Sequence, residues 1–229
     1  MIGRLLHDAS LGPYRFALVL SLICALLYLF GSGLANTSVN IDALLAYRYD
    51  AITQGELWRV FSGNLLHTNH WHLLMNLGGL WAVMFLHHFH YSFKGASALF
   101  IGLCILEGLG LWCFYPELKG YVGLSGVLHG LFAYGAVADI QKGMKSGYLL
   151  LIGVIAKVGY EQLFGASTDV TEMIGARVAT EAHLVGLISG LFCIVAVSAV
   201  NHYRKSPEHS PAQSPAAVSD KPGIKSHSK

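Results

Sequence analysis

The motif Gly123-Leu124-Ser125-Gly126 begins one apolar segment of the chain, and a second short motif, Ala182-His183, begins another. Each motif places a reactive polar side chain at the start of a segment long enough to enter a lipid bilayer. Polar side chains at that depth are unfavourable unless they pair with one another or take part in chemistry. The two motifs therefore predict a bundle of membrane helices with a polar site at one end.

The composition also indicates a membrane protein. Of the 229 residues, 54% are hydrophobic and only 12% are charged, whereas a soluble domain has about 45–50% apolar and about 25% charged residues. The net charge of +2 is too small to favour a nucleic-acid partner. The four cysteines have neither metal-ligand spacing nor a secreted disulfide pattern, so we expect no metal and no cofactor.

Hydropathy predicts an all-α membrane protein with six membrane segments. The approximate spans are residues 16–35, 72–91, 96–115, 122–140, 147–165 and 178–202. Most have the length of about 20 residues that crosses the hydrocarbon core, whereas glycines interrupt the fourth, which we expect to be short. The first run is too long for the apolar part of a cleavable signal peptide, so we expect it to be retained.

The distribution of Lys and Arg predicts the orientation of these segments. If the N-terminus is cytoplasmic, the inner segments carry more Lys and Arg, and the outer loops hold most of the acidic residues, which favours an N-in, C-in topology. The starts of segments two, four and six then face the periplasm. We expect residues 1–202 to form the membrane domain. Residues 203–229 have almost no large apolar side chains and are expected to be a disordered cytoplasmic tail.

Ser125 is a candidate nucleophile. Gly123 allows the backbone to turn tightly and a substrate strand to approach, and Gly126 keeps the first helical turn slim for a neighbouring helix. The N–H groups at the start of a helix are unpaired and can stabilise a developing oxyanion. The alternative is that this Gly-x-Ser-Gly pattern serves helix packing alone.

His183 is a candidate general base, because a serine needs a base to become a nucleophile and histidine is the usual one. Gly186 and Gly190 follow it, and their spacing would let segments four and six pack closely enough for His183 to reach Ser125. The alternative is a histidine bonded to a backbone carbonyl within the bundle. The one acidic residue near His183 in the sequence is Glu181, which helical phase turns away.

A third polar group lies in the run HTNHWHLLMNLGGL, residues 67–80. His72 and Asn76 are spaced i, i+4 and therefore share one helix face. Both side chains can donate hydrogen bonds to an oxyanion. His67 precedes them in the loop. The alternative is a polar patch that satisfies the hydrogen bonds of its own loop.

In this order, the motifs resemble those of the rhomboid family of intramembrane serine proteases, over residues 14–202. The resemblance implies a six-transmembrane-helix rhomboid-like bundle whose Ser125 and His183 form a Ser–His dyad without the acidic third member of the usual triad. It also implies an oxyanion hole made by His72, Asn76 and the Ser125 N–H. The matching residues are Trp58-Arg59, His67, His72, Asn76, Gly123 to Gly126, Ala182-His183, Gly186 and Gly190.

His129 departs from the family pattern. Four residues after the serine, rhomboids often carry an aromatic side chain that packs on the base histidine, and an imidazole at this position could still stack on His183. The run GLSGVLHGL is similar to the rhombosortase branch. This resemblance implies cleavage, in the bacterial inner membrane, of exported proteins whose C-terminal signal holds a Gly-Gly motif, one membrane helix and a basic cluster. The implied partners are therefore transmembrane segments of exported proteins and the lipid bilayer.

Other readings stay open from the sequence. The chain could be a non-catalytic rhomboid-like protein that binds membrane clients, or the same dyad could act as a transpeptidase. His87, His88 and His90 invite a metal site, but a polar flank of the segment is favoured, because no carboxylate is close in sequence. Lys157 and Glu161 are spaced i, i+4 in segment five and are expected to pair with each other, rather than to supply a Ser–Lys dyad.

Overall fold

The computed structural model describes residues 2–31 and 40–205, and almost all of the secondary structure in these residues is helical. The long helices are α1 (Ile2–Gly31), α5 (His70–Leu86), α6 (Phe93–Phe114), α7 (Ser125–Gln141), α8 (Ser146–Phe164) and α10 (Thr180–Lys205). Each corresponds to one predicted segment. Residues 206–229, most of the predicted tail, and residues 32–35 of the first predicted segment lie outside the described residues.

Four of these helices have stretches that are long and apolar enough to cross a membrane. The stretches are Leu11–Gly31, Phe93–Phe114, Ser146–Phe164 and Thr180–Arg204. Helices α5 and α7 have 17 residues each, or about 26 Å of helix, slightly less than the hydrocarbon thickness of about 30 Å. The chain is therefore a helical membrane protein, and the count of six crossings stays a prediction.

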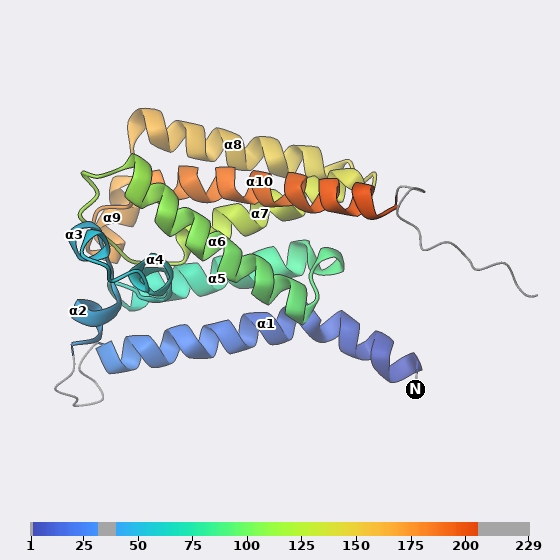
Figure 1. The fold of residues 1–229 in the computed structure, drawn as a ribbon, viewed down its shortest axis with the longest axis horizontal. Coiled ribbons are helices and arrows are strands. Elements are labelled where there is room, and N and C mark those ends of the chain that lie inside the picture. Colours follow the sequence, from blue (N-terminus) through green and yellow to red (C-terminus); the bar gives the residue numbers. More distant parts are fainter. Residues whose placement is uncertain (1, 32–39, 206–229) are drawn as a thin grey trace, which may run out of the picture. The chain divides into compact units, whose positions relative to one another are not determined.

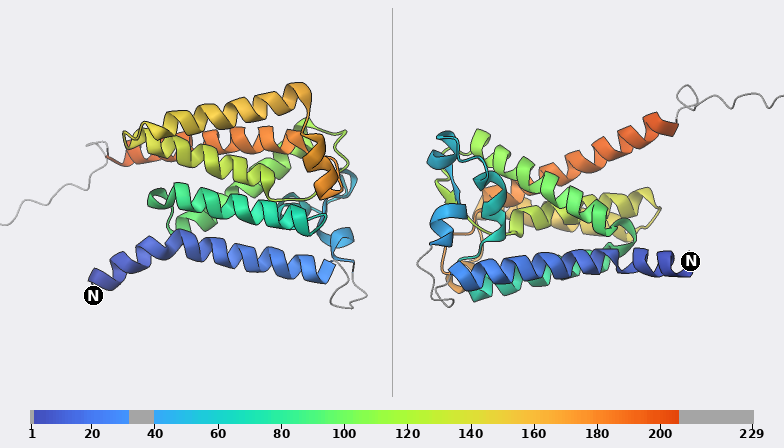
Figure 2. Two further views of the ribbon diagram at one scale, coloured as in Figure 1. Left: turned by 180° about the vertical axis from the view of Figure 1, so that it is seen from behind. Right: turned by 60° about the horizontal axis from the view of Figure 1, so that its bottom comes forward.

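The chain divides into two compact units at Val195, and the site described below lies in the first. In this unit α7 packs against α5, α6 and α8, while α1 lies alongside α5 and α6 (Figure 1). The left view in Figure 2 shows α1 and α8 at opposite edges of this group of helices. Helix α7 is therefore the central element, which explains why most of its side chains are small or apolar.

Glycines set the distance between α7 and α10. A Cβ atom on Gly186 would overlap the backbone carbonyl of Gly126, and one on Gly190 would overlap that of Gly130. The two helices therefore touch through backbone, as the Gly-x-x-x-Gly spacing predicted. The fourth segment is short, as expected, since α7 has 17 residues, but its glycines do not interrupt the helix. Helix α7 is continuous, because its glycines lie at packing contacts rather than at a break.

The first loop folds into short elements beside the bundle. They are α2 (Ile41–Leu45), β1 (Tyr47–Arg48), α3 (Tyr49–Thr53), α4 (Arg59–Ser62) and the 3-10 turn η1 (Gly63–Leu65). Strand β1 pairs antiparallel with β2 (Gly120–Tyr121), with Tyr47 opposite Tyr121. The remaining elements are the 3-10 turn η2 (His88–His90) and α9 (Thr168–Ile174).

Arg59 holds this loop together from inside. Its guanidinium donates to the carbonyl oxygens of Ala46 and Ala43, each at 2.8 Å, and to the Glu56 carboxylate at 2.6 Å. The side chain is only 6% exposed. A planar group with five donors suits several acceptors at once. The pairing of β1 with β2 then connects this loop to the segment that leads into α7.

Candidate active site

Ser125 and His183 meet where α7 and α10 begin. Ser125 is the first residue of α7, and His183 lies in the first turn of α10. The Ser125 Oγ is 2.9 Å from Nε2 of His183, a normal hydrogen-bond distance. His183 is 4% exposed. The glycine contacts between α7 and α10 bring the two side chains within reach.

Gly123 shapes the chain before Ser125. Its φ of +128° is a conformation that other residues rarely adopt. A Cβ atom at this position would also lie 2.7 Å from Nε2 of His72 and 3.6 Å from Nδ2 of Asn76. The two candidate oxyanion donors therefore gather around the backbone that precedes Ser125. Gly126 must also be small, because a Cβ atom there would collide with the Glu107 carboxylate.

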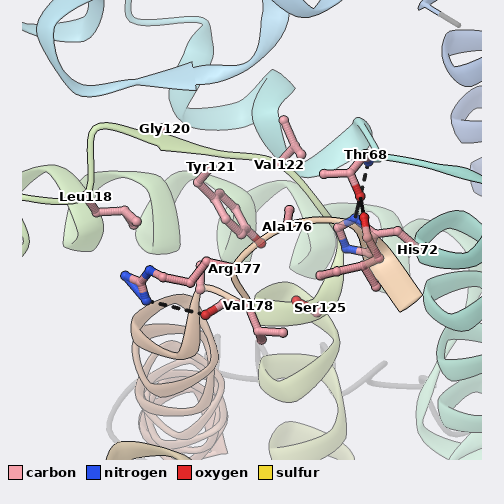
Figure 3. A pocket seen from close by; sticks show the side chains of 12 residues that line it. Thr68, His72, Leu118, Gly120, Tyr121, Val122, Ser125, Ala176, Arg177 and Val178 are labelled. Carbon is pink, nitrogen blue, oxygen red and sulfur yellow. Dashed lines mark hydrogen bonds between the residues drawn. The ribbon is translucent and has the colours of Figure 1, made fainter. Parts of the chain in front are cut away.

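The ring of His72 is held by the loop that precedes α5. The Thr68 N–H donates to Nδ1 of His72 at 3.3 Å, and the Thr68 hydroxyl donates to the Ile174 carbonyl at 2.7 Å. With Nδ1 accepting, the ring hydrogen lies on Nε2, the nitrogen that faces Gly123. Figure 3 shows His72 and Ser125 lining the same pocket, with Thr68 above the imidazole.

His129 lies one turn after Ser125 and stacks on the base. The ring centroids of His129 and His183 are 4.3 Å apart with an angle of 23° between the ring planes. Nδ1 of His129 is 2.7 Å from the Ser125 carbonyl oxygen, so this nitrogen carries the hydrogen and donates it. The imidazole thus takes the stacking position anticipated for an aromatic residue.

The expectation that no acidic side chain approaches His183 is wrong. Oε2 of Glu161, in α8, lies 2.8 Å from Nδ1 of His183. Glu181 does turn away, and pairs with Arg177 at 2.6 Å. Residues 161 and 183 are on different helices, so their contact depends on a helix register that hydropathy does not give. The available signal was a charged pair within an apolar segment, which needs partners inside the bundle.

Lys157 lies at the centre of this group. Its Nζ is 2.8 Å from Oε2 of Glu161, 2.8 Å from Nε2 of His129 and 3.2 Å from Nδ1 of His183. Among the described residues, no hydrogen bond joins Lys157 to Ser125. Ligand atoms of His129, Glu161 and His183 lie within 4.8 Å of one another, as in a metal site. The ammonium already faces all three, so the geometry favours an internal ion pair.

Ser125 borders two cavities of different character. One, of about 300 Å³, lies beneath the loop after α9 and is also lined by His72, Tyr121 and Arg177 (Figure 3). The other, of about 510 Å³, is mostly apolar and opens between α5, α7 and α8. A substrate backbone could therefore reach Ser125 from a polar side and an apolar side.

The other histidines singled out in the sequence lie away from the Ser125–His183 contact. His67 is buried beside His72, at 5.1 Å between ring centroids. The idea that His87, His88 and His90 form a polar flank is wrong for two of them. His87 and His90 are hydrogen-bonded to a buried Asp139 from α7, while His88 bonds the Phe85 carbonyl. The carboxylate missing from the nearby sequence comes from another helix.

Comparison with known proteins shows which sequences this chain is similar to. Residues 54–200 match the family model described as "Rhomboid domain". The chain is 29% identical over 196 residues to "Rhomboid protease GlpG" of Klebsiella pneumoniae (strain 342), covering 82% of this chain and 64% of that protein. It is 27% identical to the protein of the same name from Salmonella newport (strain SL254), covering 79% of this chain and 61% of that protein. The chain thus spans less than two thirds of the length of these relatives.

Proposed function

Because the chain belongs to the rhomboid family, we propose that it is a serine-type intramembrane endopeptidase. The observation that carries this proposal is the hydrogen bond between Ser125 Oγ and His183 Nε2, at 2.9 Å, where two cavities meet. A hydroxyl that faces a buried imidazole nitrogen is the arrangement that activates serine. The similarity to proteins named rhomboid protease supports the same activity.

In the first half of the reaction, the Ser125 Oγ attacks the carbonyl carbon of the scissile peptide bond. The hydroxyl proton passes to Nε2 of His183, and negative charge develops on the carbonyl oxygen. The Ser125 N–H, Nε2 of His72 and Nδ2 of Asn76 are the donors for this oxyanion. The C–N bond then breaks, the leaving amine takes the proton from Nε2, and an ester to Ser125 remains.

In the second half, water attacks the ester carbon and gives a proton to Nε2 of His183. The bond to Oγ breaks, the proton returns to the serine oxygen, and the new C-terminal carboxylic acid leaves. The cavity lined by His72, Tyr121 and Arg177 is the polar route for this water. An amine that attacks in place of water would give transpeptidation through the same ester.

The substrates we propose are transmembrane segments of exported proteins that carry Gly-Gly-type C-terminal signals. The run GLSGVLHGL, similar to the rhombosortase branch, supports this class. Glycine lowers helix stability by about 1 kcal/mol per residue relative to alanine, so such a segment unwinds readily into the extended form that a serine protease cleaves. The apolar cavity between α5 and α8 suits the helical part that follows.

The proposed location is the bacterial inner membrane, with six crossings in an N-in, C-in topology. The starts of α5, α7 and α10 then lie on the periplasmic side, where exported substrates are. The excess of Lys and Arg in the segments assigned to the cytoplasm supports this orientation. A reporter enzyme that is active only in the cytoplasm should therefore be active when it is fused after Lys229. A reporter that is active only in the periplasm should be inactive there.

Covalent labelling with a fluorophosphonate tests the proposed activity directly. The detergent-purified protein should be labelled at Ser125, and the Ser125→Ala and His183→Ala variants should not be labelled. Ser189→Ala is the matched control, because Ser189 is also a serine buried in a membrane helix, and it should be labelled like the wild type. Absence of labelling in folded wild type would contradict the proposal and favour a client-binding protein.

A second assay tests the substrate class. A reporter with a Gly-Gly motif, one apolar helix and a basic cluster should be cut, and the same reporter with Leu-Leu should be cut more slowly. Equal cutting of both would contradict the Gly-Gly class but leave the protease activity standing. Mass analysis with an added amine separates hydrolysis from transpeptidation.

A further inference from the structure

We propose that Glu161 of α8 is a positioning residue for His183, and that it selects the reactive tautomer of this histidine against a competing donor, Lys157. The site would then work as a Ser–His–Glu arrangement rather than as the dyad that the family resemblance implied. The inference rests on the proposed function, because it concerns how His183 serves Ser125.

The argument begins with Nδ1 of His183, which has two possible partners. Oε2 of Glu161 lies at 2.8 Å and Nζ of Lys157 at 3.2 Å. A neutral imidazole nitrogen either donates or accepts, so only one of these contacts is a hydrogen bond at a time. A carboxylate only accepts and an ammonium only donates. The two neighbours therefore demand opposite tautomers of the same ring.

The two tautomers have opposite consequences for Ser125. If Nδ1 donates to Glu161, Nε2 carries a lone pair and can take the proton of Ser125. If Nδ1 accepts from Lys157, Nε2 carries the hydrogen and cannot act as a base. In serine proteases with an acidic third member, the wrong tautomer reduces kcat about 10⁴-fold. The shorter distance to Glu161 favours the reactive tautomer, in which Nδ1 carries the hydrogen.

Lys157 then has a supporting role, because two of its three hydrogens are donated to other groups. It donates to Oε2 of Glu161 and to Nε2 of His129, each at 2.8 Å. Glu161 is one helical turn from Lys157, and its side chain is 11% exposed. The Lys157 side chain is 45% exposed at the surface of α8, and the pair lowers the unfavourable free energy of keeping either charge in a membrane helix. The ammonium thus holds the carboxylate in place while the carboxylate holds His183.

A double-mutant cycle with methionine separates selection of the tautomer from simple structural support. Methionine is long, flexible and uncharged, and its sulfur is only a weak acceptor. The rate constant of fluorophosphonate labelling should fall about 10²–10⁴-fold in Glu161→Met, because Lys157 is left alone with Nδ1. It should fall less than about tenfold in Lys157→Met. The double variant should be at least about tenfold faster than Glu161→Met, since the competing donor is gone.

The nitrogen chemical shifts of ¹⁵N-labelled histidine report the tautomer itself, a readout that a loss of packing would not move. The His183 signals, assigned by their loss in His183→Gln, should show the hydrogen on Nδ1 in the wild type and on Nε2 in Glu161→Met. Glu161→Asp, which keeps the carboxylate, should restore part of the labelling rate. Glu181→Met is the matched control, because Glu181 is two residues from His183 but pairs with Arg177.

Two results would overturn the inference. One is a folded Glu161→Met that is labelled within threefold of the wild-type rate. The other is a double variant no faster than Glu161→Met, which would show that Lys157 does not compete for Nδ1. If Glu161→Met fails to fold, the labelling rate of the double variant tests the inference instead. A rate below one thousandth of the wild-type rate would contradict competition between Glu161 and Lys157 for Nδ1. Absence of fluorophosphonate labelling in the folded wild type would instead contradict the proposed function.

Discussion

The part of the chain that the structure describes contains two imidazole–carboxylate clusters, one near each end of α7. The Ser125 cluster, defined as Ser125, His183 and Glu161, lies where the helix begins. The Asp139 cluster, defined as Asp139, His87 and His90, lies near its other end, about 21 Å away along the helix. Both join a carboxylate to histidine inside an apolar bundle. They differ in how many of their hydrogen-bonding atoms already have partners within the cluster.

In the Asp139 cluster both carboxylate oxygens are occupied. Oδ2 of Asp139 is 3.0 Å from Nδ1 of His87, and Oδ1 is 2.6 Å from Nε2 of His90. The Asp139 side chain is 2% exposed. In the Ser125 cluster, the histidine uses one nitrogen for the carboxylate and presents the other to a hydroxyl beside two cavities. Both oxygens of the Asp139 carboxylate are thus used within the fold, whereas the Ser125 cluster presents a hydroxyl to two cavities, as the proposed activity requires.

The largest expected effect is the loss of turnover on removing the base of the Ser125 cluster. His183→Ala should lower the rate of reporter cleavage by about 10⁴-fold or more, because the serine loses its proton acceptor. The midpoint of thermal unfolding in detergent should change by only a few degrees. His88→Ala, which removes a histidine that bonds a carbonyl of its own turn and lies outside both clusters, should cleave at the wild-type rate. Cleavage by His183→Ala above one hundredth of the wild-type rate would contradict the assignment.

The next effect sharpens the comparison within the Ser125 site. His72→Ala should lower kcat about 10²–10³-fold, since it removes a donor that is used mainly when the oxyanion forms. KM should change little, because the interaction is absent from the bound ground state. His70→Ala is the control, as an exposed histidine two residues earlier. A rise in KM at constant kcat would mean that His72 binds substrate instead.

The Asp139 cluster should show the opposite pattern. Asp139→Leu leaves donors of His87 and His90 buried without their acceptor, so the free energy of unfolding should fall by about 3 kcal/mol. The cleavage rate per folded molecule should remain that of the wild type. Denaturant unfolding and active-site titration with the fluorophosphonate measure the two quantities separately. A stable Asp139→Leu with a lower rate per labelled serine would mean that the two clusters are coupled.

These two clusters also show what the sequence could predict. The sequence predicted where the long helices begin and which glycines lie at helix contacts, because hydropathy and residue spacing are local patterns. The family resemblance pointed to the polar residues at 72, 76, 125 and 183. The contacts of Glu161 with His183 and of Asp139 with His87 were not predicted. Each contact joins residues from different helices, and their register is set by side-chain packing. The folded first loop was missed for the same reason, since Arg59 bonds carbonyls 13 and 16 residues away.

His67 offers the smallest predicted effect and a third environment, a buried histidine without a carboxylate. Burial and, to a lesser degree, the neighbouring His72 lower its pKa to about 3 from the ordinary value of 6.5. Between these values the unfolded chain binds one more proton than the folded chain. The stability that depends on an uncharged His67 is therefore fully present above pH 6.5. It decreases as the pH falls below 6.5, by about 1.4 kcal/mol per pH unit.

The comparison of wild type with His67→Phe isolates this contribution, because the other histidines are common to both proteins. Between pH 7 and pH 5, the wild type should lose about 2 kcal/mol more stability than His67→Phe. Denaturant unfolding in detergent at the two pH values gives both differences. Equal losses would show that His67 takes up its proton in the folded state. In that case the buried loop before α5 opens more readily than its packing against His72 indicates.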